Sequence, residues 1–155
     1  MTNPKKLFVF DLDFTLWNAG GTWCDHTNPP YARVNGYIED ALGSKIVLYK
    51  DVKDILQLLS EANIPMALAS RTGAPSWARE LLRLFSIEHY FKHEQIYPGS
   101  KVEHFGHIQE ATGIDFSDMV FFDDEMRNIH DVGRLGVEAV LVNNGVTMNI
   151  IKKYL

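Results

Sequence analysis

Short, continuous apolar runs alternate with amphipathic helical patterns along most of this sequence. An uninterrupted run such as LFVF at 7–10 is typical of a strand that is buried on both faces, as strands in parallel sheets are. We expect strands at 6–12, 64–70, 94–98, 119–124 and 137–142. The sequence therefore predicts an α/β fold, a Rossmann-like three-layer sandwich in which helices cover both faces of a central parallel sheet of about five strands.

Helical patterns fill the segments between these strands. We expect helices at 51–62, 75–85, about 101–112, about 125–135 and 147–154. In the first of them Val52, Ile55, Leu58 and Leu59 fall on one face, and Asp51 stands where an N-cap is expected. Pro75 opens the second, because its fixed φ and missing N–H suit the first helical turn.

The segment 18–49 interrupts this alternation. It contains several turn dipeptides, among them Gly20-Gly21 and Asn35-Gly36, and is interpreted as too polar to join the core. Its second half, 37–49, has the pattern of two short strands about a turn. We expect one domain over residues 1–155, with 18–49 forming a short hairpin flap over the mouth of a site.

Composition narrows the classes of protein that are possible. With 46% hydrophobic and 23% charged residues, the chain is typical of a globular protein. The longest apolar stretches fall short of the roughly 18 residues that a transmembrane helix needs, and MTNPKK does not resemble a secretory signal. We expect a cytoplasmic protein without a membrane partner. The net charge of −5 disfavours nucleic acid as the main partner, and Cys24, being the single cysteine, excludes an internal disulfide.

Charged and hydroxyl side chains follow the predicted strands at the points where each strand ends. They are Asp11 and Asp13 after the first strand, Ser70 and Arg71 after the second, Lys101 after the third, and Asp123 and Asp124 after the fourth. Ligands of open parallel sheets bind beyond the carboxyl ends of the strands. A single acid in such a place is as well explained as a helix cap, but the coincidence of four segments favours a functional site.

Four aspartates at one sheet edge would repel one another unless a cation lay between them. Mg²⁺ prefers carboxylate, carbonyl and water oxygens, so these residues indicate a magnesium site. A divalent cation beside a lysine and a serine hydroxyl is a receptor for a dianionic phosphoryl group.

The ordered segments DLDFTLW, ASRT, GSKVEHF and FFDDE resemble the four motifs of the haloacid dehalogenase (HAD) superfamily, and most closely those of its small magnesium-dependent phosphatases. The resemblance covers almost the whole chain. Phe14 departs from it, since many members of the superfamily have glycine there. Only 98–100 separate the third strand from Lys101, and the first insertion is hairpin-sized, so we expect a member without a cap domain and with an open site.

The resemblance implies a role for each acid. Asp11 would be the nucleophile that forms an aspartyl-phosphate, and Asp13 would protonate the leaving oxygen and then act as base toward water. The carboxylate of Asp11, the backbone carbonyl of Asp13 and Asp123 would bind Mg²⁺. Asp124 would either bind the metal directly or orient a water on it, and the sequence leaves both possibilities open.

The resemblance also assigns the substrate-binding groups. Ser70 would donate to a phosphoryl oxygen, and Lys101 would balance the charge of the nucleophile. Arg71 is either a clamp for a phosphate or carboxylate or a solvated loop residue. Thr15 would tie the first loop by a hydrogen bond, and Asn128 would brace the acidic loop.

Several aromatic and histidine side chains allow two interpretations. Trp17, Trp23 and Tyr31 either line the entrance to the site or pack the flap onto the domain. His104 and His107, three residues apart on a predicted helix, have the spacing of zinc ligands, but no second pair accompanies them, so solvated helix histidines are the preferred interpretation.

These features predict a Mg²⁺-dependent phosphomonoester hydrolase that acts on phosphotyrosine in proteins, on small sugar phosphates, or on both. We expect a monomer or weak dimer. A receiver domain that stores an aspartyl-phosphate is the alternative from another class, but it places its phospho-acceptor aspartate on a middle strand, whereas Asp11 ends the first. A phosphotransferase or phosphomutase using the same aspartate calls for a closed, water-excluding cap.

Overall fold

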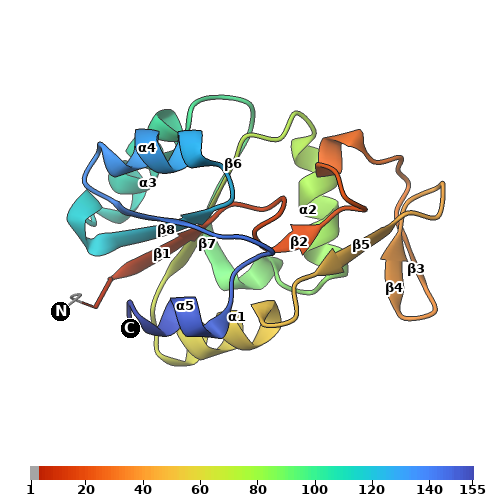
Figure 1. Cartoon of the computed structure of the whole chain (residues 1–155), viewed down its shortest axis with the longest axis horizontal. Helices are drawn as coiled ribbons and strands as arrows, with labels where there is room; N and C mark the ends of the chain where they lie inside the picture. The colour runs from red at the N-terminus through yellow and green to blue at the C-terminus, as the bar shows by residue number, and fades with distance from the viewer. Residues whose placement is uncertain (1–3) are drawn as a thin grey trace.

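The computed structural model describes residues 4–155, and its centre is a five-stranded sheet (Figure 1). The strands are β1 (Leu7–Phe10), β6 (Met66–Ser70), β7 (Phe91–Ile96), β8 (Met119–Asp123) and β9 (Glu138–Leu141). They run parallel in the order β7-β6-β1-β8-β9. The four strands whose ends were predicted to carry the site, β7, β6, β1 and β8, are therefore consecutive neighbours in the sheet.

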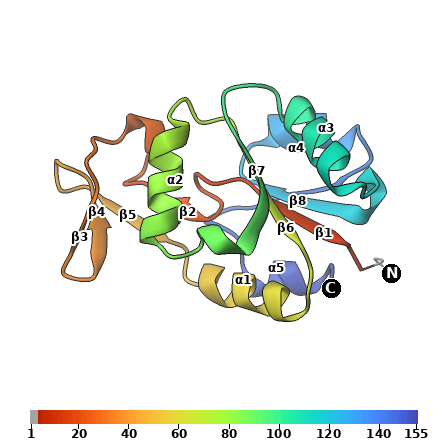
Figure 2. The ribbon, with the colours of Figure 1, turned by 180° about the vertical axis from the view of Figure 1, so that it is seen from behind.

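Helices cover both faces of this sheet, as Figure 1 and the reverse view in Figure 2 show. One layer contains α3 (Lys101–Thr112) and α4 (Met126–Gly133), and the other contains α1 (Val52–Glu61), α2 (Pro75–Leu84) and α5 (Met148–Lys152). None of the helices within 4–155 is both long and apolar enough to cross a membrane.

The alternation of side chains along β1 separates two hydrophobic clusters. Phe8 and Phe10 belong to the cluster that α1, α2 and α5 cover, whereas Leu7 and Val9 belong to the cluster beneath α3 and α4. All four are fully buried, as expected of a strand with helices on both sides. The predicted three-layer α/β class is confirmed.

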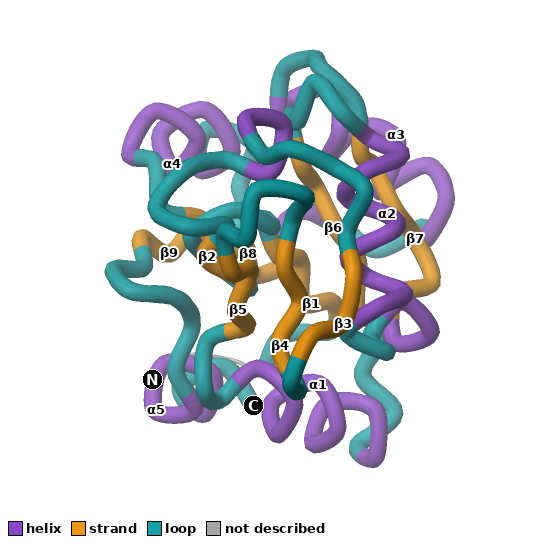
Figure 3. Tube along the Cα trace, turned by 90° about the vertical axis from the view of Figure 1, so that its right-hand side faces the viewer, coloured by secondary structure: helices purple, strands orange, loops and turns teal. Residues whose placement is uncertain are grey.

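The insertion after β1 is larger than the predicted hairpin. It forms an antiparallel sheet in the order β2-β5-β4-β3, built from β2 (Trp17–Asn18), β3 (Ala32–Val34), β4 (Tyr37–Glu39) and β5 (Lys45–Leu48), which lies toward the viewer in Figure 3. The β4–β5 pair is the hairpin predicted at 37–49.

The prediction that this insertion is too polar for the core is wrong. Ile38 and Ile46 pair across β4 and β5 and are buried, together with Tyr31, in the same cluster as Phe8 and Phe10. In short strands, buried apolar residues alternate with exposed polar ones, so the sequence of the segment as a whole looks polar. The insertion and the central sheet therefore share one hydrophobic cluster. The single domain over 1–155 stays a prediction, and residues 1–3 of it lie outside the described part.

Two local predictions also need correction. Strand β7 begins at Phe91 and not near residue 94. It is an edge strand whose polar middle residues are only partly buried, so its sequence lacks the continuous apolar run by which the other strands were predicted. Asp51 precedes α1, but its side chain does not cap that helix. Its Oδ2 accepts a hydrogen bond of 3.0 Å from the backbone N–H of Met148, and so joins the starts of α1 and α5.

Candidate active site

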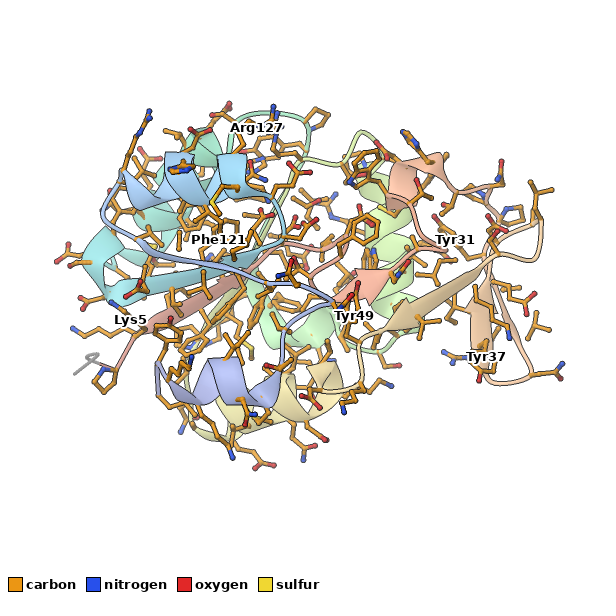
Figure 4. All side chains as sticks on the ribbon, viewed as in Figure 1. Lys5, Tyr31, Tyr37, Tyr49, Phe121 and Arg127 are labelled. Atoms are coloured by element: carbon orange, nitrogen blue, oxygen red, sulfur yellow. The ribbon has the colours of Figure 1, made fainter. Side chains whose placement is uncertain are left out.

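A cavity of about 240 Å³ opens at the carboxyl edge of the central sheet. It is lined by Asp11, Asp13, Trp23, Asp25, His26, Ser70, Arg71, Thr72, Lys101, Asp124, Glu125, Arg127 and Asn128. One of these residues, Arg127, is labelled near the top of Figure 4, on α4. All but one of the predicted site residues line this cavity, and the exception, Asp123, lies fully buried behind it.

Lys101 supplies a buried positive charge to the floor of the cavity. Its Nζ lies 3.1 Å from Oδ1 of Asp11 and 3.3 Å from Oδ2 of Asp123, and it also donates to the carbonyl of Ala69. Lys101 is the first residue of α3, whose N-cap Ser100 accepts a hydrogen bond of 3.1 Å from Glu103 N. Helix capping thus fixes the start of α3 and with it the position of the ammonium group.

Three carboxylates gather beside this lysine. Oxygens of Asp11, Asp123 and Asp124 all lie within 4.8 Å of one another. Burial raises the pKa of Asp11 well above its usual value, and burial together with the charge of Asp123 raises the pKa of Asp124 to about 6. One lysine leaves this group of carboxylates with excess negative charge, so the donor set fits a hard cation such as Mg²⁺.

Hydrogen bonds hold Asp123 in place. Its Oδ1 accepts from the backbone N–H of Glu125 at 2.9 Å, and its Oδ2 accepts from Nδ2 of Asn128 at 3.0 Å. Asn128 is buried on α4 and so braces the acidic loop, as the sequence predicted. Asp124, in contrast, is partly exposed to the cavity.

Asp13 lies in the same cavity, but its side chain is outside the group of three carboxylates. Its Oδ1 accepts hydrogen bonds from Nε1 of Trp17 at 2.8 Å and from the backbone N–H of Cys24 at 2.9 Å. Burial raises the pKa of Asp13. The carboxyl group is therefore held as an acid that faces the cavity, and metal binding through its backbone carbonyl stays a prediction.

The loop after β1 turns sharply at Phe14, which has a φ of 63°. This is the left-handed region that favours glycine, and it gives a physical reason why glycine is common at this place in the superfamily. The hydrogen bond predicted for Thr15 is present, from its Oγ1 to Oδ2 of Asp11 at 3.3 Å.

Ser70 ends β6, Arg71 follows it, and both line the cavity. Ser70 is 2% exposed, and its Oγ accepts a hydrogen bond of 3.3 Å from Thr72 N. The hydroxyl proton therefore remains available to donate to another acceptor. Arg71 donates to Oδ1 of Asn128 at 3.4 Å, so it is held at the cavity wall although its side chain is exposed. Its role as a substrate clamp stays a prediction.

The two interpretations of the aromatic residues are resolved by their burial. Trp17 and Tyr31 pack the insertion onto the domain, with the Trp17 ring 6.0 Å from Phe85. Trp23 is 47% exposed and lines the cavity. Asp25, His26 and Arg127 were not predicted, because nothing in the sequence distinguishes them from ordinary surface residues. Thr72 and Glu125 lie in the motifs ASRT and FFDDE but were given no role.

The solvated interpretation is wrong for His104 and correct for His107. His104 is fully buried, its Nε2 lies 3.0 Å from the carbonyl of Tyr97, and burial together with the charge of Lys101 lowers its pKa to about 4. His107 is about half exposed on the same helix. Burial also raises the pKa of the Cys24 thiol, which makes it a poor nucleophile.

The cavity combines a carboxylate paired with a lysine, a second carboxyl group that can carry a proton, and acidic donors for a metal. This combination suits transfer of a phosphoryl group. Together with a parallel sheet of this strand order, it defines a HAD-type phosphatase. Residues 3–155 match the family model described as Acid Phosphatase. The chain belongs to this family.

Individual relatives agree with this assignment. The chain is 44% identical over 155 residues to Magnesium-dependent phosphatase 1 of Homo sapiens, an alignment that covers 99% of this chain and 86% of the relative. It is 36% identical to a HAD-like hydrolase superfamily protein of Schizosaccharomyces pombe, covering 97% and 94% of the two chains. A HAD-superfamily hydrolase from Ehrlichia chaffeensis has the same fold, with a TM-score of 0.69 at 14% identity and 99% coverage of both chains. The predicted superfamily and enzyme class are confirmed.

Proposed function

We propose that this phosphatase is a Mg²⁺-dependent phosphomonoester hydrolase that works through a covalent aspartyl-phosphate on Asp11. The observation that carries the proposal is the position of Asp11, whose carboxylate lies against both Lys101 and the other acidic donors in a cavity that Asp13 also lines. In this proposal the nucleophile and the acid/base, two residues apart in the chain, act on one phosphoryl position.

The carboxylates of Asp11, Asp123 and Asp124 and the backbone carbonyl of Asp13 would hold Mg²⁺. When bound, the ion supplies positive charge that stabilises the transferring phosphoryl group. The printed name of the human relative supports this cofactor, and the three clustered carboxylates are donors that Mg²⁺ prefers.

The reaction has two steps in this proposal. Asp11 attacks phosphorus, and the bond to the leaving oxygen breaks as Asp13 transfers its proton to that oxygen. Asp13, now a carboxylate, then takes a proton from the water that attacks phosphorus and releases phosphate from Asp11. The burial that raises the pKa of Asp13 favours the protonated form needed first.

Ser70, Arg71 and Lys101 would bind the phosphoryl oxygens. The Ser70 hydroxyl and the Lys101 ammonium are buried, so their interactions with a bound anion are little screened by water. Arg71 lies farther out and would contact either the phosphoryl group or an anionic part of the leaving group.

The cavity favours a small substrate or a single phosphorylated side chain. Its volume of about 240 Å³ accommodates a phosphoryl group and a compact leaving group. Trp23 offers an indole at the rim, against which a phosphotyrosine ring or the apolar face of a sugar would pack. Phosphotyrosine in proteins and small sugar phosphates are therefore the two substrate classes proposed.

The test is phosphate release from p-nitrophenyl phosphate, a phosphotyrosyl peptide and several sugar phosphates, with Mg²⁺ and with EDTA, for the wild type and Asp11→Asn. We expect Mg²⁺-dependent release that Asp11→Asn abolishes. A stable acyl-phosphate without release would contradict hydrolysis and favour the phospho-acceptor or transferase alternative. Hydrolysis of only one substrate class would exclude the other.

A further inference from the structure

The acid/base Asp13 is oriented by Trp17, the last residue of the first motif, and by the backbone of Cys24 in the insertion. Two N–H donors reach the same oxygen, Oδ1, from Nε1 of Trp17 at 2.8 Å and from the backbone of Cys24 at 2.9 Å. We propose that Trp17 is a positioning residue that fixes which oxygen of Asp13 exchanges the proton with the substrate. This inference rests on the proposed function of Asp13.

The turn between Asp13 and Trp17 places the indole N–H beside the carboxyl group of Asp13. Phe14 takes a φ of 63°, and its N–H donates to the carbonyl of Trp17 at 2.7 Å, so residues 13 and 17 lie side by side as an isolated bridge. Trp17 is fully buried and packs against Phe85 on the side of α2. The indole N–H is therefore fixed by packing as well as by the backbone.

The second donor comes from the insertion, which is itself anchored to the loop after β6. Cys24 Sγ lies 3.5 Å from Oγ1 of Thr72, and the backbone N–H of Gly73 donates to Oδ2 of Asp25 at 3.2 Å. Asp13 is thus held between the first strand of the insertion and a segment that is hydrogen-bonded to the loop directly after Ser70. The insertion takes part in orienting the acid as well as covering the site.

The chemical consequence follows from the direction of these hydrogen bonds. An indole or backbone N–H can only donate, so Oδ1 is an acceptor whether Asp13 is protonated or ionised. The exchangeable proton then belongs on Oδ2, from which it passes to the leaving oxygen and to which the proton of the attacking water returns. Without the indole N–H one of two restraints is lost, and the carboxyl group rotates more freely away from this geometry.

The effect of losing this positioning on the reaction rate should depend on how much the leaving group needs to be protonated. p-Nitrophenolate leaves without protonation, whereas an alkoxide from glycerol phosphate requires the acid. For Trp17→Phe we expect kcat/KM for glycerol 2-phosphate to fall about tenfold or more beyond any fall for p-nitrophenyl phosphate, the size expected for one hydrogen bond to a charged group. Trp77→Phe is the matched control, because Trp77 packs on the same hydrophobic cluster without lining the cavity, and it should leave the ratio of the two kcat/KM values unchanged.

A second variant keeps the test independent of packing changes. Trp17→3-benzothienylalanine retains the shape of the side chain and replaces only the indole N–H by sulfur, and it should reproduce the selective loss. Equal loss on both substrates, or no loss in this variant, would overturn the positioning role. Failure of the wild type to hydrolyse either substrate would instead overturn the proposed function.

Discussion

Lys101 places its Nζ 3.1 Å from Oδ1 of Asp11, although the two residues are 90 positions apart in the chain. The same Nζ lies 3.3 Å from Asp123. The pairing joins the start of α3 to the loop after β1. It ties the charge of Asp11 to the stability of the fold, because an unpaired buried charge is strongly destabilising.

We expect Lys101→Met to lower both activity and stability. Removing the ammonium leaves the carboxylates of Asp11 and Asp123 without their buried partner, so kcat should fall by about 10²-fold or more and the free energy of unfolding by about 3–5 kcal/mol without metal. Urea unfolding with and without Mg²⁺ measures this, and Mg²⁺ should restore part of the loss. Lys6→Met is the control, since the exposed Lys6–Asp118 pair should contribute at most about 1 kcal/mol. Equal effects of the two substitutions would contradict this account.

Stabilisation by Mg²⁺ should grow as the pH rises through about 6. Burial and the charge of Asp123 raise the pKa of Asp124 to about 6, and burial raises that of Asp11. In the metal-free protein these carboxyls keep protons that the unfolded chain has already released, so they lower the free energy of unfolding as the pH rises through this range. Mg²⁺ binds the ionised forms and reverses the loss.

Thermal melts with Mg²⁺ and with EDTA, at about pH 5 and about pH 7.5, measure this difference directly. The gap between the two melting temperatures should be wider at the higher pH. The buried His104, whose pKa is lowered to about 4, makes both forms less stable as the pH falls below its unfolded value, but this contribution cancels in the gap. A gap that is independent of pH would contradict the assignment of these carboxylates to the metal.

Gly145→Ala should destabilise the protein far more than Gly21→Ala. Both glycines have positive φ, 81° and 84°, so both substitutions introduce backbone strain of about 1 kcal/mol. A Cβ at position 145 would lie 2.2 Å from Cγ of Tyr49, whereas a Cβ at position 21 meets no atom within 4 Å. Urea unfolding of the two variants isolates the clash with the Tyr49 ring, and equal losses would show that the ring moves aside without penalty.

Trp23→Ala should weaken binding of aromatic substrates selectively. The exposed indole at the cavity rim is expected to contribute about 1 kcal/mol to packing against a phosphotyrosine ring. KM for a phosphotyrosyl peptide should therefore rise about fivefold, and KM for glycerol 2-phosphate should change little. Equal changes for both substrates would exclude Trp23 as a determinant of specificity.

The central part of the site could be predicted from the sequence because its residues end buried parallel strands. Asp11, Ser70 and Asp123 follow runs whose continuous apolar character marks them as β1, β6 and β8, and the parallel direction of these strands brings their ends together. Lys101 follows a less regular strand and was placed by its motif.

The insertion could not be predicted equally well, because its strands have only two to four residues and give alternation little length in which to show. His104 is different, since its burial was readable from the sequence. Lys101, His104, Phe105 and Ile108 have helical i, i+3, i+4, i+7 spacing and all face inward. Treating the two histidines as a pair hid this pattern, because only His104 belongs to it.

The most direct test of the account is to trap the covalent intermediate. In the Asp13→Asn variant, p-nitrophenyl phosphate should still phosphorylate Asp11, but the resulting acyl-phosphate should be hydrolysed very slowly. The Mg²⁺ affinity of this variant should remain close to that of the wild type. After acid quenching, peptide mass spectrometry should find one phosphoryl group on Asp11 in this variant and none when Asp11→Asn is added. A phosphoryl group on another residue, or normal turnover by either single variant, would contradict the proposed mechanism.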